Sequence, residues 1–281
     1  MSPVRVVVLT SAAMIAFAAN SVLCRMSLGA GHIDPSSFTS IRLLSGTICL
    51  LLIIGRRDRS IALGRPRVAG VAALFTYMIG FSFAYQSLST GTGALLLFGF
   101  VQLTMLGTAA YRGERWSGLA WAGVLMAVCG LVYLLLPGFE APDPLYSLFM
   151  ATAGIAWGIY SILGAGGDDP TRSTARNFLY ATPLALLVSI FDFDQMVISW
   201  QGLLLSIASG ALASGIGYAI WYTALKHIRA SSAAIVQLSV PALATLGGVL
   251  LLAEPLSVRI VFATALTISG IALVLIRKAA N

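Results

Sequence analysis

Residues 15–23 of the chain read IAFAANSVL, and residues 155–163 read IAWGIYSIL, 140 positions further along. The same offset relates other identical positions of the two halves: Ala84 and Ala224, Ala94 and Ala234, Gly107 and Gly247, Glu114 and Glu254, Ser117 and Ser257, Gly130 and Gly270. Chance matches of Ala and Gly are common in an apolar chain, whereas acidic residues are scarce, so the paired glutamates weigh most. The sequence therefore predicts an internal repeat, with copies in residues 1–140 and 141–281.

The composition places this repeat in lipid rather than in water. Of the 281 residues, 58% are hydrophobic and 10% are charged, whereas soluble globular chains carry about 25% charged residues. A soluble protein of this length would need more polar surface to cover its core. The net charge of +7 does not indicate nucleic-acid binding, because the basic residues stand singly or in short clusters between long apolar runs. We expect an all-α integral membrane protein.

Ten segments are long and apolar enough to cross a membrane. A helix needs about 20 residues to span a hydrocarbon core about 30 Å thick, and its backbone groups must be satisfied internally. The sequence predicts transmembrane helices at residues 5–27, 37–55, 67–87, 92–111, 117–136, 144–164, 173–191, 200–224, 231–252 and 257–276. The connection around residues 89–91 is short, so nine or eleven spans stay open. Because five spans per copy is an odd number, we expect two inverted five-helix repeats.

The distribution of basic residues predicts the orientation of the chain. Fourteen of the 17 Lys and Arg residues fall on the side of both termini: Arg5, Arg56, Arg57, Arg59, Arg65, Arg67, Arg112, Arg115, Arg172, Arg176, Lys226, Arg229, Arg277 and Lys278. Only Arg25 and Arg259 fall on the other side, so both termini should be cytoplasmic. Arg42 lies a few residues inside the second span. We expect it to reach the headgroups rather than to bind an anion.

Several classes of function are disfavoured by the residues that are missing. The cysteines Cys24, Cys49 and Cys129 lie in apolar runs without a C-x-x-C pair, which argues against disulfides and zinc. No cluster of His, Asp, Glu, Ser or Cys occurs at membrane depth, and no phosphate-binding loop is present. We therefore expect neither an enzyme nor a cofactor or metal. Residues 5–18 imitate a cleavable secretory signal, but the segment recurs in the second half, so we expect it to be retained.

The acidic residues give little support for proton coupling. No acidic residue lies near the middle of a span, where proton-coupled carriers usually place one. Glu114 and Glu254 lie between helices on opposite sides of the predicted membrane. They could act as gates, but helix-end capping or pairing with Arg112, Arg115 or Arg259 is the interpretation that we prefer.

Several motifs together resemble a known family. They are residues 16–20 (AFAAN), 155–158 (IAWG), Glu114 with Gly123 and Gly130, and 222–225 (YTAL) running into residues 230–241. This set resembles the drug/metabolite transporter superfamily and its EamA-type branch of two five-helix repeats, over nearly the whole chain. The narrower likeness is to YddG-type aromatic amino-acid exporters of bacterial inner membranes. It implies amino-acid export through a central cavity lined by the first, third, fourth, sixth, eighth and ninth spans.

Departures from the repeat concern the expected kinks. The fourth span has Val101 where the ninth has Pro241, and the first has Ala18 where the sixth has Gly158. Pro241 removes one backbone bond and should bend its helix. The half-helix kinks are therefore expected to differ between the two copies.

Polar and aromatic residues at helical spacing supply the candidates for substrate binding. Rings can stack on apolar or aromatic side chains and take an ammonium group over a ring face, and amides can receive polar groups. The candidates are Asn20, Tyr77, Phe81, Tyr85, Phe98, Gln102, Trp157, Tyr160, Tyr218, Trp221 and Gln237. Two alternatives stay open: aromatic residues also serve as interface anchors, and amides also form interhelical hydrogen bonds worth about 0.6 kcal/mol.

The sequence thus predicts a membrane transporter whose partners are a small-molecule substrate and the lipid bilayer. The hypothesis is export of aromatic, hydrophobic and other neutral amino acids by alternating access and facilitated diffusion. Efflux of drugs or other metabolites with proton coupling is the alternative, and a scaffold role is a third. A monomer is compatible with the sequence, which leaves the oligomeric state open.

Overall fold

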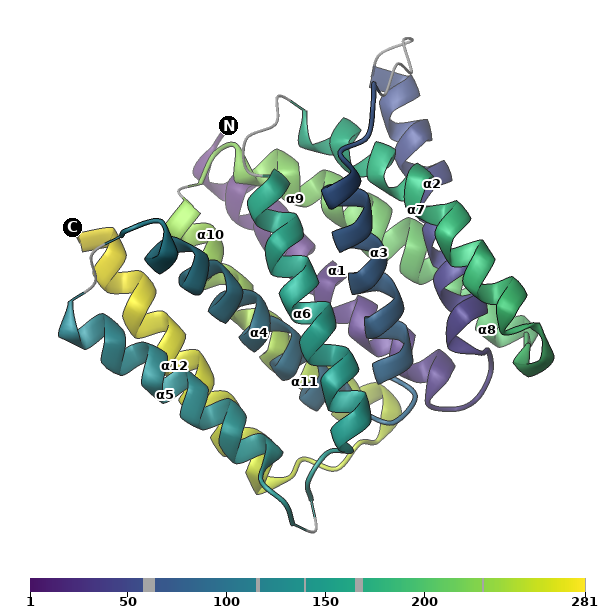
Figure 1. The fold of residues 1–281 in the computed structure, drawn as a ribbon. Helices are drawn as coiled ribbons and strands as arrows, with labels where there is room; N and C mark the ends of the chain where they lie inside the picture. The colour runs from purple at the N-terminus through teal and green to yellow at the C-terminus, as the bar shows by residue number, and fades with distance from the viewer. Residues whose placement is uncertain (58–63, 115–116, 139, 165–168, 229, 281) are drawn as a thin grey trace.

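A computed structural model describes residues 1–57, 64–114, 117–138, 140–164, 169–228 and 230–280 as a bundle of helices (Figure 1). The first half contains α1 (Pro3–Leu28), α2 (Pro35–Arg57), α3 (Val68–Ala84), α4 (Thr90–Tyr111) and α5 (Gly118–Leu135). The second half contains α6 (Pro144–Gly164), α7 (Pro170–Phe191), η1 (Phe193–Gln195), α8 (Trp200–Ala208), η2 (Ser209–Ile216), α9 (Gly217–Leu225), α10 (Ala230–Gln237), α11 (Ser239–Leu252) and α12 (Val258–Ala280).

The all-α membrane class is confirmed, and the expected spans agree with these helices to within a few residues. In the described ranges, nine helical segments are long and apolar enough to cross a membrane, among them the continuous run Trp200–Leu225. The tenth expected span, α3, is apolar but has only 17 residues. At 1.5 Å per residue it is about 25 Å long, so the turn that follows it must complete the crossing.

Polar residues just before the helices explain where many of them begin. The hydroxyl oxygens of Ser2, Ser89 and Ser199 each accept a bond from a backbone N–H in the first turn of α1, α4 and α8. The Asp169 carboxylate does the same for α7. These caps satisfy backbone donors that have no partner within the helix. Pro is the first residue of α1, α2, α6 and α7, a position where its missing N–H costs nothing.

The two halves share local geometry at positions 140 residues apart. Ser117 caps α5 through the N–H of Ala120, and Ser257 accepts from the N–H of Ile260 at the start of α12. Gly113 and Ala253, the residues before the paired glutamates, both have positive φ, at 85° and 51°. Both therefore turn the chain sharply at the end of a helix.

The pairing of α5 with α12 also repeats itself. A Cβ atom built on Gly123 would lie 2.6 Å from the carbonyl oxygen of Gly270, and one on Gly130 would lie 3.0 Å from that of Ala263. Gly130 and Gly270, like Gly123 and Ala263, are 140 residues apart, so the second contact is the first with the two halves exchanged. Small residues let these backbones approach closely, as is common for helices in membranes.

We expect Gly123→Val to destabilise the bundle by about 1–3 kcal/mol, the usual range for overpacking, because the new side chain would meet the α12 backbone. The measurement is the melting temperature of the purified protein in detergent. Gly107→Val is the matched control, because nothing lies within 4 Å of a Cβ atom built there. Equal melting temperatures for the two variants would contradict the close crossing.

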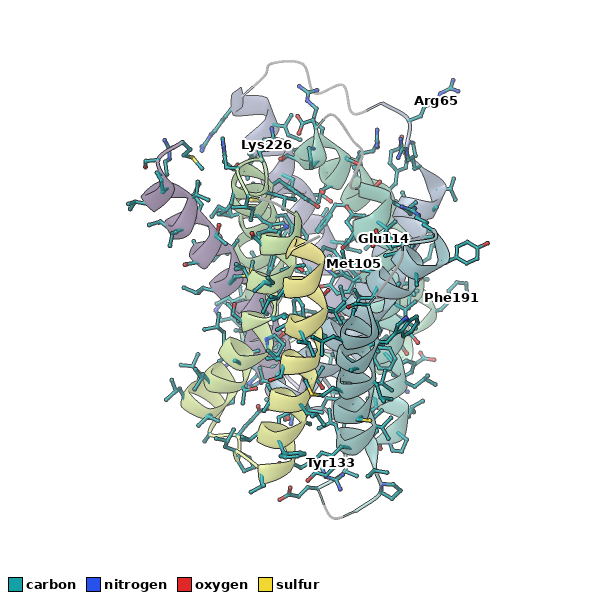
Figure 2. The ribbon with its side chains drawn as sticks, turned by 90° about the vertical axis from the view of Figure 1, so that its left-hand side faces the viewer. Arg65, Met105, Glu114, Tyr133, Phe191 and Lys226 are labelled. Carbon is teal, nitrogen blue, oxygen red and sulfur yellow. The ribbon has the colours of Figure 1, made fainter. Side chains whose placement is uncertain are left out.

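The helix pairs have clear places in the bundle (Figure 1). The α5/α12 pair lies at one edge, and α2 packs on α7 near the other edge. Between them lie α1, α3, α4, α6 and α9 to α11. Both chain ends lie along one side of the bundle, which we call the terminal face, and the other side is the opposite face. Figure 2 shows Arg65 and Lys226 near the end of the bundle away from Tyr133. Arg59, Arg115 and Arg229 are outside the described residues.

Two helical runs of the second half are irregular. Eight residues in the middle of Trp200–Leu225 form the π-helix η2, a geometry that often occurs at functional sites. The ninth span is interrupted between α10 and α11, at Leu238. Pro241 explains this interruption, because it has no N–H to donate to the carbonyl of Gln237. The corresponding helix α4 continues through Val101 without a break.

Candidate functional site

A small cavity lies in the middle of the bundle, where six helical segments meet. The residues that line it come from α1, α3, α4, α6, η2 and α9: Phe17, Asn20, Ser21, Tyr77, Phe81, Leu97, Phe98, Trp157, Ala213 and Tyr218. The volume of this cavity is about 20 Å³, which is room for about one water molecule. This conformation therefore holds the site closed, and a metabolite needs the walls to move apart.

Trp157 is the centre of the aromatic wall. Its ring stacks on Tyr218 at 5.3 Å between centroids and on Tyr160 at 5.2 Å, and it meets Tyr77 at 4.7 Å and 45°. Trp157 and Tyr160 lie three residues apart on α6, so they share one face of that helix. The small residues Gly154 and Gly158 allow α6 to approach α4 closely, because Cβ atoms built there would meet the α4 chain within 3 Å.

Asn20 supplies an amide to the cavity wall. Its side chain is buried, and its Oδ1 accepts a hydrogen bond from Ser209 Oγ at 2.6 Å. Ser209 is the first residue of η2, so the π-helix begins where it contacts α1. This bond between helices holds Asn20 in the cavity wall. The hydrogen-bonding alternative for Asn20 is therefore observed, and substrate contact stays a prediction.

Arg42 lies inside the bundle, which corrects the expectation that it reaches the headgroups. Its side chain is 0% exposed. Helix α2 begins at Pro35, so Arg42 is about 10 Å along the helix, on the face that packs against α3 and η2. A Cβ atom on Gly210 of η2 would collide with the carbonyl group of Arg42. Because Gly210 has no side chain, η2 can pack over Arg42 and separate it from lipid.

Ring faces and hydroxyl groups surround the Arg42 guanidinium. Its carbon lies 4.9 Å from the ring centre of Phe81 and 5.6 Å from that of Tyr77. Nη2 donates to Tyr77 Oη at 3.2 Å, and Nε and Nη2 approach Ser214 Oγ at 3.4 Å. Nη1 has no hydrogen-bond partner. A buried positive charge therefore lies directly behind two rings that line the cavity.

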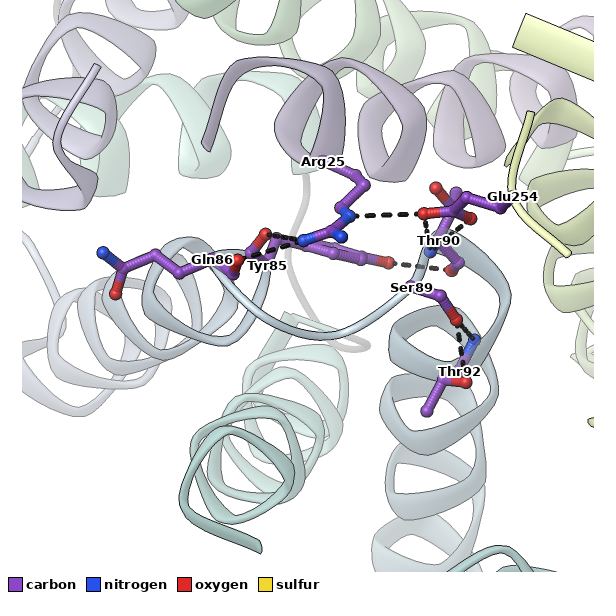
Figure 3. Close-up of polar contacts among 7 residues, drawn as sticks. All are labelled: Arg25, Tyr85, Gln86, Ser89, Thr90, Thr92 and Glu254. Atoms are coloured by element: carbon purple, nitrogen blue, oxygen red, sulfur yellow. Dashed lines mark hydrogen bonds and ion pairs between the residues drawn. The ribbon is translucent and has the colours of Figure 1, made fainter. Parts of the chain in front are cut away.

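The opposite face is closed by a latch, which we define as Arg25, Glu254 and the backbone N–H of Thr90 (Figure 3). Arg25 Nε lies 3.2 Å from Glu254 Oε1, and the N–H of Thr90 donates to both carboxylate oxygens. Arg25 also donates to the carbonyl oxygens of Tyr85 and Gln86. The carboxylate caps the start of α4. The latch therefore joins α1, the α3–α4 connection and the segment between α11 and α12.

The partner expected for Glu254 was wrong. Arg259 donates instead to the carbonyl oxygens of Leu136 and Leu134 at the end of α5. Arg25 takes its place because α1 ends beside the α3–α4 connection. Gly248 allows the approach, because a Cβ atom there would collide with the Glu254 carboxylate.

Tyr85 fills the space between the latch and the cavity. Its side chain is fully buried, its ring meets Phe81 edge-on at 4.8 Å, and its hydroxyl donates to the carbonyl of Thr90. Gly93 makes room for the ring, because a Cβ atom there would lie 2.5 Å from it. The path from the cavity to the opposite face is thus blocked by one aromatic ring and then by the latch.

A wider vestibule of about 360 Å³ opens towards the terminal face. Its described lining contains four arginines and one acid: Arg65, Arg67, Arg172, Arg176 and Asp169. At its base, Thr174 Oγ1 donates to Tyr222 Oη, and Tyr160 Oη donates to Thr174 while it accepts from Asn177. We call Tyr160, Thr174, Asn177 and Tyr222 the inner layer. It separates the basic vestibule from Trp157 and the cavity.

The structure brings six of the eleven candidate residues to the cavity wall: Asn20, Tyr77, Phe81, Phe98, Trp157 and Tyr218. Tyr85 and Tyr160 lie in the next layers on either side, and Trp221 packs edge-on against Phe17, behind the wall. Gln102 is buried in α4 with an unpartnered Nε2, and Gln237 lies at the end of α10; neither is part of the described lining.

Sequence reasoning missed Phe17 and Ser21 in the cavity wall, and it placed Arg42 at the headgroups instead of inside the bundle. Phe17 and Ser21 share a helix face with Asn20, so their spacing could have revealed them. The signal for Arg42 was a charge inside an apolar span, which by default marks a functional site.

Comparison with known proteins agrees with this architecture. The model of the EamA-like transporter family matches residues 4–136 and again residues 144–276, two matches that are 140 positions apart. An uncharacterized protein of Pseudomonas aeruginosa is 49% identical over 271 residues, which cover 96% of this chain and 94% of that protein. The uncharacterized transporter YoaV of Bacillus subtilis is 22% identical, with 88% and 89% covered.

An uncharacterized transporter of Archaeoglobus fulgidus is 23% identical, with 88% of this chain and 90% of that protein covered. A crystal structure of a protein with 24% sequence identity superposes with a TM-score of 0.67 and covers 94% of this chain and 97% of its own. That similarity establishes the fold alone. The double match to the family model spans both halves of the bundle, and the chain therefore belongs to the EamA-like transporter family.

Proposed function

We propose that this transporter exports amino acids with aromatic, hydrophobic or other neutral side chains from the cytoplasm. The observation that carries the proposal is the cavity wall, where Trp157, Tyr77 and Tyr218 surround a small space that also contains the amide of Asn20. Aromatic rings stack on apolar side chains and attract ammonium groups. An amide can serve both polar ends of a zwitterion.

We propose alternating access between the two halves, residues 1–140 and 141–281, as the mechanism. In this proposal both termini lie on the cytoplasmic side of the bacterial inner membrane. The vestibule then faces the cytoplasm, and the latch faces outward. A substrate enters the vestibule, passes the inner layer when Tyr160 and Tyr222 separate, and reaches Trp157. Release to the outside then requires Tyr85 to move and the latch to open.

Facilitated diffusion is the driving mode that the cavity supports. Its described lining contains no Asp, Glu or His, so it offers no side chain of the type that carries protons in coupled carriers. Proton-coupled efflux of drugs or other metabolites would have to use a group outside the wall, such as Glu254 in the latch.

The test is efflux from proteoliposomes that contain the purified protein. We expect internal phenylalanine, leucine and other neutral amino acids to leave at least tenfold faster than from protein-free vesicles, with the same rates with and without a proton gradient. The measurement is the loss of labelled solute over time. Retention of all amino acids, with release of a cationic dye only when a proton gradient is applied, would favour the drug-efflux alternative.

A further inference from the structure

Arg42 is a buried cation without a counter-ion. Among the residues that the structure describes, it is the one charged residue that is buried. The titratable groups that face it from α1, α3 and α9 are Cys24, Tyr77 and Tyr218, none of them a carboxylate. No described ion pair includes it. The charge is thus balanced only by ring faces and hydroxyl groups.

A buried guanidinium is destabilising unless an anion pairs with it. Burying a charge without a partner is strongly destabilising, and cation–π contacts with Tyr77 and Phe81 offset only part of that cost. Nη1 makes no hydrogen bond at all. A buried donor without a partner indicates a missing ligand or water, and for a guanidinium the best-matched ligand is a carboxylate, which can accept two parallel bonds.

The rings of Tyr77 and Phe81 lie between the Arg42 guanidinium and the cavity. Tyr77 and Phe81 both line the cavity and lie against Arg42. The hydroxyl that Tyr77 offers to Nη2 occupies the place that a carboxylate oxygen of a ligand could take when the cavity widens. A ligand with its apolar body against Trp157 could therefore direct an acidic end past Tyr77 to Arg42.

The charges of the vestibule also favour an anionic ligand. Four arginines and one acid line the described part of the vestibule. Asp169 pairs with Arg172, which leaves an excess of positive charge, and such an excess in a cleft raises the local concentration of anions. The described cavity lining, by contrast, holds no acid that could pair with an ammonium group.

We propose that Arg42 binds the carboxylate of the substrate, and that the transporter also accepts monoanionic carboxylates that have an aromatic or apolar body but no α-ammonium group. This inference rests on the proposed function, because it takes the central cavity as the transport site. It goes further in making the carboxylate, rather than the ammonium group, the feature that is recognised.

The driving force for such substrates follows from their charge. A monoanion that leaves a compartment with a negative interior moves down the membrane potential, and 100 mV shifts its distribution by about 50-fold. A zwitterion carries no net charge and gains nothing. Facilitated diffusion would thus export anions against their concentration gradient, driven by the membrane potential and without a proton-binding residue in the cavity.

The experiment compares three solutes of similar shape in proteoliposomes: phenylalanine, 3-phenyllactate and phenylalaninamide, with protein-free vesicles giving the leak. A potassium gradient with valinomycin sets the interior at about −100 mV. We expect phenyllactate to leave through the protein and to reach an outside-to-inside ratio about 50-fold above that at zero potential. Phenylalanine should leave with no change in its final ratio, and phenylalaninamide should be retained.

Substitutions of Arg42 separate recognition from a structural role. We expect Arg42→Gln to raise the Kd for phenyllactate at least tenfold, measured by quenching of tryptophan fluorescence in detergent, whereas Arg42→Lys should keep part of the affinity. Arg112→Gln is the matched control, because Arg112 is exposed at the end of α4. Melting temperatures of all variants show whether each one is folded, and Arg42→Lys preserves the charge if Arg42→Gln does not fold.

The outcomes distinguish the inference from the proposed function. If phenylalanine leaves and phenyllactate does not, or if Arg42→Lys and Arg42→Gln leave phenyllactate binding unchanged, the carboxylate site is overturned and amino-acid export stands. If neither solute leaves faster than from protein-free vesicles, both proposals are overturned. Equal release of phenylalaninamide and phenyllactate would also overturn the carboxylate site.

Discussion

Replacing Glu254 by Gln should unlock the opposite face, so that a cysteine introduced by Ser21→Cys reacts about 30-fold faster with an external maleimide that cannot cross the membrane. The Glu254 carboxylate is only 13% exposed and binds Arg25 and the start of α4 together. Hydrogen bonds to a charged group contribute about 1.5–3 kcal/mol each. A loss of 2 kcal/mol changes the closed-to-open ratio about 30-fold.

The position and the controls follow from the structure. Ser21 lines the cavity and is 1% exposed, so in the latched protein its substitute should react slowly from outside. Cys24, Cys49 and Cys129 are first replaced by Ala to remove background labelling. Arg259→Gln is the matched control, since Arg259 lies on the same face but binds only the end of α5. If Glu254→Gln labels no faster than Arg259→Gln, the latch does not hold the barrier closed.

Removing the ring of Trp157 should give the largest loss of transport. Trp157→Ala deletes contacts with Tyr77, Tyr160 and Tyr218 at once. Each aromatic pair contributes about 0.5–1.5 kcal/mol beyond its buried area, so the three pairs together stabilise the cavity wall by about 1.5–4.5 kcal/mol. We expect phenylalanine efflux from proteoliposomes to fall at least tenfold, and about 30-fold or more at low substrate concentration.

Two further variants show that the effect belongs to the site. Trp157→Phe keeps one ring and should recover part of the rate. Trp200→Ala removes a tryptophan that is 68% exposed at the start of α8 and should leave efflux unchanged. The role of Trp157 is refuted if Trp157→Ala, folded by its melting temperature, transports phenylalanine at the normal rate; such a result would favour a scaffold.

The helices could be predicted from the sequence because lipid allows few alternatives. Long apolar runs in a chain with few charges must form helices, and breaks such as the one before Pro241 follow from the missing N–H. Helical spacing also identified the faces of Tyr77 and Phe81, of Trp157 and of Tyr218. These predictions depend on neighbours along the chain, which periodicity reveals.

Contacts between distant segments could not be predicted in the same way. Arg25 and Glu254 are 229 residues apart, and Arg259 was the nearer cation in sequence. The prediction for Arg42 used its distance from the start of its span. Its environment depends instead on η2, because Gly210 lets η2 pack over Arg42. Depth along one helix cannot show whether lipid or protein lies beside a residue.

The two barriers of the cavity depend on different interactions. The latch joins two charged groups, whereas the inner layer is held by hydrogen bonds between hydroxyl and amide groups. Attraction between charges weakens as dissolved ions accumulate. Salt in the solution on the opposite face should therefore loosen the latch and leave the inner layer unchanged. The salinity of the habitat would thus act on one barrier of the carrier and not on the other.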